Sequence, residues 1–158
     1  MSTEKVRKFL SRCGFEGRVR EFDVSSATVA LAAEALGVAP ERIAKTLSFE
    51  DGRGCIMIVA AGDAKIDNHK FKAYFSRKAK MLPASEVEPL TGYPVGGVCP
   101  FGVNEGARVY LDASLTRFET VFPAAGTPNS AVELTPEELK TATGCSEFID
   151  VCKEAVSQ

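Results

Sequence analysis

Residues 45–61 read KTLSFEDGRGCIMIVAA, and this stretch decides how the rest of the chain is arranged. Two strand-like runs, 45–49 and 55–61, flank a turn that contains the pair Asp51-Gly52, which is typical of β-hairpins. The second run is apolar at every position, as strands buried on both faces are. The sequence therefore predicts a hairpin whose second strand lies in the middle of a sheet.

Helical patterns flank this hairpin on both sides. The strongest begins at Thr135, where a capping residue is followed by Pro136 and, three residues after the cap, by Glu138, and it should run to about Thr143. The other patterns combine a capping residue with apolar positions three or four residues apart. These helices are expected at 3–13, from a cap at Ser25 or Ser26 to Gly37, at 40–44, from Asp67 to Phe75, from Ser85 onward and at 148–156.

Further strands are expected at 108–112, 119–122 and 131–134, with an extended piece at 18–24. Strands and helices mix without a regular βαβ alternation, and the sequence shows neither an internal repeat nor a linker. We therefore expect residues 1–158 to form a single α/β domain with a mixed sheet.

Composition favours an ordinary soluble globular protein. Of the 158 residues, 45% are apolar and 25% are charged, which is close to the average for such proteins. No apolar run is long enough to cross a membrane, and the N-terminus lacks the apolar core of a signal peptide. A cytoplasmic location without membrane attachment is the resulting expectation.

Cysteine and histidine usage argues against several kinds of site. The five cysteines form no CxxC pair and His69 is the single histidine, so neither a disulfide framework nor a metal site is expected. A catalytic triad would have to use His69, and the segment 62–65 lacks the spacing of a phosphate-binding loop. No cofactor is expected.

Charge is spread unevenly along the chain. The net charge is -2, yet residues 65–80 hold six basic residues against the single acid Asp67, with Phe71, Tyr74 and Phe75 among them. Such a segment is typical either of a surface that faces phosphates or of a solvated helix face with its aromatic rings turned inward.

A glycine-rich loop, GGVCPFG at 96–102, could bring its own main chain close to a ligand. The alternative is an ordinary turn. Cys99 within it is a candidate nucleophile, although no local signature links it to His69. Lys45 is either a solvated charge at the start of a strand or, if it faces a pocket, a group suited to binding an anion.

Together these segments resemble the YbaK-type aminoacyl-tRNA deacylases, the family that includes the editing domain inserted in bacterial prolyl-tRNA synthetases. The resemblance covers about residues 20–145 and implies a mixed, mostly antiparallel, partly barrel-like sheet with surrounding helices. The segments that carry it are SSATV at 25–29, KTL at 45–47, GDAK at 62–65, TGYPVGGVCP at 91–100, Asp112 and AG at 125–126.

The resemblance implies hydrolysis of the ester that joins a wrong amino acid to the 3′ end of a tRNA. Lys45 matches the family's essential lysine, thought to hold the terminal adenosine or its phosphate, and Gly96 and Gly97 begin the loop whose backbone positions the reacting carbonyl. The nucleophile is thought to be a water aided by the ribose hydroxyl, or the thiol of a cysteinyl substrate. The residues implied to bind substrate are Ser26, Val29, Thr46, Asp63, Pro100 and Gly126.

The resemblance does not identify which amino acid is removed from the tRNA. Thr46 is similar to the residue of the cysteine-directed branch, whereas the stretch 127–131 lacks the acidic residue expected there in that branch. Cysteine, alanine, serine and threonine all remain candidates, with tRNA of the proline set as carrier. The implied partners are the tRNA acceptor end and a prolyl-tRNA synthetase. The alternatives are a binding module without activity and a hydrolase that depends on Cys99.

Overall fold

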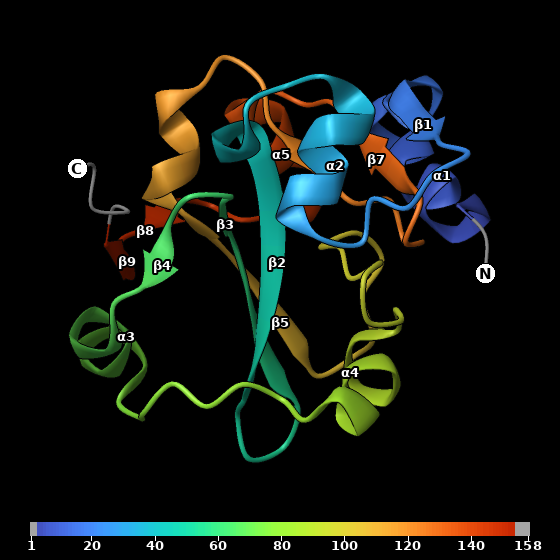
Figure 1. Ribbon diagram of the computed structural model, residues 1–158. Coiled ribbons are helices and arrows are strands. Elements are labelled where there is room, and N and C mark those ends of the chain that lie inside the picture. Colours follow the sequence, from blue (N-terminus) through green and yellow to red (C-terminus); the bar gives the residue numbers. More distant parts are fainter. Residues whose placement is uncertain (1–2, 154–158) are drawn as a thin grey trace.

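The predicted hairpin forms the centre of the computed structural model, which describes residues 3–153 (Figure 1). Strand β2 (Ile43–Glu50) pairs antiparallel with β3 (Cys55–Ala61), in a register that runs from Ala44 opposite Ala61 to Glu50 opposite Cys55. Every residue of β3 is fully buried, which confirms that this strand is central.

Both faces of β3 are covered because its side chains alternate between two helices. Cys55 and Met57 pack with Val87 of α4 (Ala84–Thr91), whereas Ile56 and Ile58 pack with Phe71 of α3 (Asn68–Phe75). Figure 1 shows α3 on one side of the hairpin, with α4 and α2 (Val29–Leu36) on the other. An apolar residue is therefore required at each position of β3.

Short strands extend the hairpin into a five-stranded mixed sheet with the order β6-β2-β3-β5-β8. The pairs β2–β6, β3–β5 and β5–β8 are parallel. Two further ribbons, β1–β7 and β4–β9, and the isolated bridges are antiparallel, so antiparallel pairing predominates over the described chain and the mixed α/β class is confirmed. The remaining strands are β1 (Val19–Glu21), β4 (Lys65–Ile66), β5 (Ala107–Asp112), β6 (Phe122–Pro123), β7 (Ser130–Val132), β8 (Phe148–Ile149) and β9 (Cys152–Lys153).

The helices expected before residue 144 are present, that at 40–44 as a 3₁₀ turn, with two corrections to their starts. Helix α2 is capped by Thr28, whose Oγ1 accepts from the Leu31 amide, and not by Ser25 or Ser26. Helix α4 begins after Pro83 without a side-chain cap, so the predicted cap at Ser85 is wrong. The other helices are α1 (Glu4–Leu10), α2 (Val29–Leu36), α5 (Pro136–Thr143) and the 3₁₀ turns Ser11–Cys13, Glu16–Arg18, Pro40–Arg42 and Ala113–Arg117.

The helix predicted at 148–156 is wrong within the described residues, where the chain forms β8 and β9. Asp112 Oδ1 accepts from the Val151 amide at 3.0 Å, and Val151 O accepts from the Asp67 amide at 2.9 Å. These long-range bonds hold the main chain of Val151 in an extended course. Residues 154–156 of that prediction lie outside the described residues. No helix in residues 3–153 is both long and apolar enough to span a bilayer.

The capping box of α5 is present as predicted. Thr135 Oγ1 accepts from the Glu138 amide at 3.0 Å, and Glu138 Oε1 accepts from the Thr135 amide at 2.9 Å. We expect Thr135→Ala to lower the free energy of unfolding by about 0.5–2 kcal/mol, because the Glu138 amide loses its partner. Urea unfolding followed by circular dichroism measures this loss. Thr141→Ala, on the exposed side of α5, should change it by less than about 0.5 kcal/mol, and equal effects would contradict the prediction.

Candidate functional site

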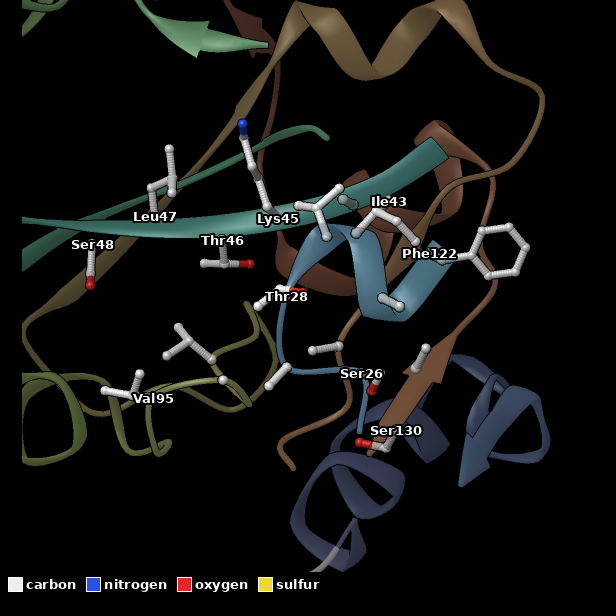
Figure 2. A pocket seen from close by; sticks show the side chains of 18 of the residues that line it. Ser26, Thr28, Ile43, Lys45, Thr46, Leu47, Ser48, Val95, Phe122 and Ser130 are labelled. Carbon is white, nitrogen blue, oxygen red and sulfur yellow. The ribbon is translucent and has the colours of Figure 1, made fainter. Parts of the chain in front are cut away.

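A cavity of about 310 Å³ lies where β2 passes between α2, α4 and the glycine-rich loop (Figure 2). Its wall is mostly apolar, and Met81 and Val95 at its rim are exposed. Among the described residues of the lining, Lys45 alone has a charged side chain. The lining residues are Ser26–Val29, Ala32, Ile43–Ser48, Met81, Val87, Val95, Gly96, Val98, Phe122, Ala124, Ser130 and Ala131.

The outer edge of β2 is open at the cavity. Strand β6 pairs with β2 at Ile43 and Ala44, and the Leu82 amide donates to Ser48 O farther along the same edge. In an antiparallel pair, the main-chain groups of alternate residues point away from the partner strand. Because Ser48 O points away from β3, the N–H and C=O of Thr46 also point outward, into the gap between these two contacts.

Two hydroxyls of the cavity lining are buried without a hydrogen-bond partner among the described residues, Ser26 Oγ and Thr46 Oγ1. Ser26 is only 8% exposed, and its amide donates to Pro128 O at 2.7 Å. A buried hydroxyl that loses its contact with water and gains no partner costs about 1–3 kcal/mol. Both oxygens are enclosed by the surrounding protein.

Lys45 and Thr46 point to opposite sides of β2 (Figure 2). Because residues opposite each other in an antiparallel pair share a face, Lys45 lies on the face of Ala60 and Thr46 on the face of Val59. Lys45 Nζ donates to Gly62 O at 3.2 Å and to Ala64 O. Burial lowers the pKa of this ammonium below its usual value, against the opposing effect of Cys152 and Asp63.

Asp63 lies outside the cavity lining, beside the Lys45 ammonium. Arg117 holds it through two contacts, from Nη2 to Oδ1 at 2.5 Å and from Nη1 to Oδ2 at 3.1 Å. The hydrogen bond from Arg117 keeps the pKa of the Asp63 carboxyl below its usual range. Asp63 is thus a fixed negative charge within the loop that holds Lys45.

The glycine-rich loop contributes its first residues to the cavity. Gly96 lines it, with φ of 90°, a conformation that favours glycine. Gly97 packs against the main chain behind the cavity, since a Cβ added there would lie 2.9 Å from carbonyl carbons of Gly126 and Thr127. Gly126 and Pro100 are not among the lining residues, and Pro100 instead borders a separate crevice beside Phe9.

Cys99 points into the protein core. It is completely buried, lies outside the cavity lining, and its thiol donates to Phe101 O at 4.0 Å. Burial raises the pKa of the Cys99 thiol to about 12, so the group is a neutral thiol near pH 7. This position and charge state disfavour Cys99 as a nucleophile.

Alkylation tests this assignment. Iodoacetamide at pH 8 should leave Cys99 unmodified in the folded protein while the partly exposed Cys13 reacts, because only a thiolate within reach of the reagent is attacked. Mass spectrometry of proteolytic peptides reports each site, and alkylation in guanidinium chloride should modify both. Modification of Cys99 as fast as Cys13 in the folded state would show that the thiol is accessible.

One aromatic ring of the basic segment, that of Phe71, is turned inward. Phe71 is fully buried, and its ring lies 5.0 Å from that of Phe49 and 4.6 Å from that of Phe75. Lys70 pairs with Asp150 at 2.9 Å, and Tyr74 keeps 48% of its surface exposed. Phe71 thus fits the second alternative for this segment, a solvated helix face with its rings turned inward, whereas the exposed Tyr74 does not.

The structure thus brings Ser26, Val29, Lys45, Thr46 and Gly96 to one cavity and places Gly97, Gly126, Pro100 and Asp63 around it. The sequence did not indicate Ile43, Phe122 or Ser130, which also line the cavity. The alternation of side chains along β2 could have indicated Ile43. Within residues 3–153, no group of three or more histidine, cysteine, aspartate or glutamate side chains gathers as metal ligands would.

Comparisons with known proteins agree on one relationship. The model of the family described as "Aminoacyl-tRNA editing domain" matches residues 24–142. The chain is 54% identical to "Uncharacterized protein YwhH" of Bacillus subtilis over 98% of its own length and 99% of that protein's. It is 32% identical to "Putative Cys-tRNA(Pro)/Cys-tRNA(Cys) deacylase EbsC" of Enterococcus faecalis, over 75% of this chain and 73% of that protein.

A solved structure extends this likeness to three dimensions. It is titled "Crystal structure of a putative trans-editing enzyme for prolyl tRNA synthetase", and the two chains superpose with a TM-score of 0.86 at 31% identity. The alignment covers 97% of this chain and 99% of the other.

Proposed function

Because the chain belongs to the YbaK-type family of aminoacyl-tRNA editing domains, we propose that it is a hydrolase that removes wrongly attached amino acids from tRNA of the proline set. It acts in trans as a single editing domain, in the cytoplasm where tRNA is charged. One observation carries this proposal: the open main chain of Thr46 and the glycine-rich loop meet at one small, mostly apolar cavity, and the Lys45 ammonium lies across β2 from Thr46 (Figure 2).

The cavity suits a small acyl group. At about 310 Å³ it lies near the lower end of ligand pockets, which span roughly 300–1,000 Å³. The aminoacyl group enters on the Thr46 face, where apolar side chains such as Val29 and Phe122 surround it. Double-sieve editing requires that a cognate prolyl group be excluded from this cavity.

The open edge of β2 separates the two parts of the substrate. With the aminoacyl group on the Thr46 face, the terminal adenosine crosses this edge and its phosphate or ribose meets the ammonium of Lys45 on the other face. The carbonyls of Gly62 and Ala64 hold that ammonium in place. Asp63 lies in the same loop, between Gly62 and Ala64, and so acts on substrate only through the position of Lys45.

In this arrangement, catalysis comes from holding the ester in position and from the fixed dipoles of main-chain groups. The main chain at Gly96 and Gly97 orients the ester carbonyl, and Gly126 and Pro100 shape the loop from behind. No carboxylate or imidazole lines the cavity among the described residues, which agrees with the water aided by the ribose hydroxyl, or the thiol of a cysteinyl substrate, that the family resemblance implies as nucleophile. An ester held in this way needs less assistance than an amide would.

Deacylation of a panel of charged tRNAs tests the proposal. The protein is mixed with tRNA of the proline set charged with alanine, cysteine, serine, threonine or proline, and the loss of each ester is measured against its spontaneous hydrolysis. We expect at least one small amino acid to be released far faster than proline. Saturable tRNA binding without release of any amino acid would instead identify a binding module and contradict the proposal.

A further inference from the structure

We propose that the purine base of the terminal adenosine of the tRNA lies on an apolar surface formed by Leu47 and Met81, beside the ammonium of Lys45. This inference rests on the proposed function, because it assigns a place to the nucleoside that carries the ester. It starts from one observation: an exposed methionine flanks the outer edge of β2, on the same face of the sheet as Lys45.

Lys45, Leu47 and Phe49 share one face of β2. Side chains alternate along a strand, so residues that are two positions apart point to the same side. Figure 2 shows Leu47 on the same side of β2 as Lys45, opposite to Thr46. Both Lys45 and Leu47 line the cavity, which therefore reaches this face as well as the Thr46 face.

Met81 reaches the same face from the segment between α3 and α4. It forms an antiparallel bridge with Phe49, and residues opposite each other in such a pair share a face. The next residue, Leu82, belongs to the apolar cluster that contains Met57 on the other face, as the alternation requires. Met81 is therefore a diagonal neighbour of Leu47, at a spacing of about 7–8 Å that long side chains can bridge.

This surface is open to a ligand, unlike the ring beside it. Phe49 is only 3% exposed, because its ring packs against that of Phe71. Met81 keeps 57% of its surface exposed, Leu47 is half-buried, and both line the cavity. A methionine side chain is adaptable and makes favourable contacts with aromatic rings. Covering the two side chains with a flat ring would remove apolar surface from water.

An apolar surface beside a single cation matches the chemistry of a nucleotide. Lys45 and Leu47 are about 6–7 Å apart along the strand, so a ligand here meets an ammonium at one end and apolar side chains at the other. A nucleotide has the same division, between an anionic phosphate and a base whose π-face stacks whatever its sequence. The sugar between them carries the ester, which places the acyl group at the open edge beside Thr46.

Removal of the terminal base tests this placement. The protein is given tRNA of the proline set that carries the amino acid released fastest in the panel, attached either to the normal terminal adenosine or to a terminal ribose 5′-phosphate without a base. We expect kcat/KM to be about tenfold lower for the tRNA without the base. The loss should lie mainly in KM, because a contact made equally in the ground state and the transition state affects binding alone.

Two variants connect this difference to the surface. Met81→Ala should retain the fold, because the side chain is exposed, and should lower kcat/KM for the normal tRNA by about five- to tenfold without changing the value for the base-free tRNA. Leu47→Ala, assayed where it remains folded, should have the same selective effect. The matched control is Val24→Ala, which removes a side chain that is 60% exposed and lies outside the cavity lining; it should change neither value.

The outcomes separate this inference from the function on which it rests. If no amino acid is released from the normal tRNA, the proposed function itself fails. If the unsubstituted protein hydrolyses both tRNAs with equal kcat/KM, the function stands and the inference is overturned. An equal loss on both tRNAs in Met81→Ala would also overturn it, since the methionine would then contact a part of the substrate other than the base. So would unchanged hydrolysis of the normal tRNA by that variant.

Discussion

Substitution of Lys45 by alanine is expected to lower the rate of ester hydrolysis by about 10²–10³-fold, the usual effect of removing one fixed electrostatic group from an active site. The ammonium is half-buried and held by two main-chain carbonyls, so it contributes a charge at a defined position rather than a mobile one. Single-turnover deacylation of the best substrate, with variant in excess over tRNA, measures the change in the chemical step.

Two further variants isolate the charge of Lys45. Lys45→Met keeps most of the side-chain volume along β2 and removes only the ammonium, so it should lose nearly as much activity as Lys45→Ala. Lys65→Ala removes an exposed lysine from the neighbouring strand β4 and should lose less than about threefold, as expected for a solvated charge. Full activity of Lys45→Met would show that the ammonium plays no part in the reaction.

Substitution of Gly97 by alanine is expected to affect both stability and activity. The added Cβ would lie 2.9 Å from main-chain atoms of Gly126 and Thr127, and main chain cannot rotate away as a flexible side chain can. Overpacking of this kind costs about 1–3 kcal/mol. Because the displaced loop also carries Gly96 at the cavity, we expect deacylation to fall by more than tenfold at a temperature where the variant remains folded.

Gly17→Ala is the matched control for this substitution. No atom lies within 4 Å of a Cβ added at Gly17, and its φ is not in the left-handed region. This variant should change the free energy of unfolding by less than about 0.5 kcal/mol and leave deacylation unchanged. Urea unfolding and the deacylation assay, applied to both variants, would contradict the prediction if Gly97→Ala behaved like Gly17→Ala.

The sequence predicted the elements whose signals are local. The hairpin followed from the Asp51-Gly52 turn and the uninterrupted apolar run of β3, and α5 followed from its capping box. The start of α2 was predicted wrongly because hydroxyl residues at 25, 26 and 28 all precede the same apolar pattern. Only the structure shows that Thr28 is the cap.

Other features depend on contacts between distant parts of the chain. Phe148, Val151 and Cys152 have helical spacing, yet the bond from the Val151 amide to Asp112 holds that segment extended. Phe122 and Ser130 reach the cavity through the pairings of β6 and β7, which no local pattern indicates. The resemblance named Lys45 and Thr46 together, whereas the period of a strand places them on opposite faces.

Only a short part of the β2 edge is unpaired, and this limits which molecules can pair with the sheet. A free strand edge invites pairing with other chains, which leads to aggregation or to unwanted capture of peptides. Here β6 occupies the edge at Ala44, and the Leu82 amide occupies it at Ser48. Only the main chain of Thr46 remains between them, too short a segment for a foreign strand to add to the sheet. The sheet can therefore offer the main-chain hydrogen bonds of one residue to a small ligand while remaining closed to polypeptides.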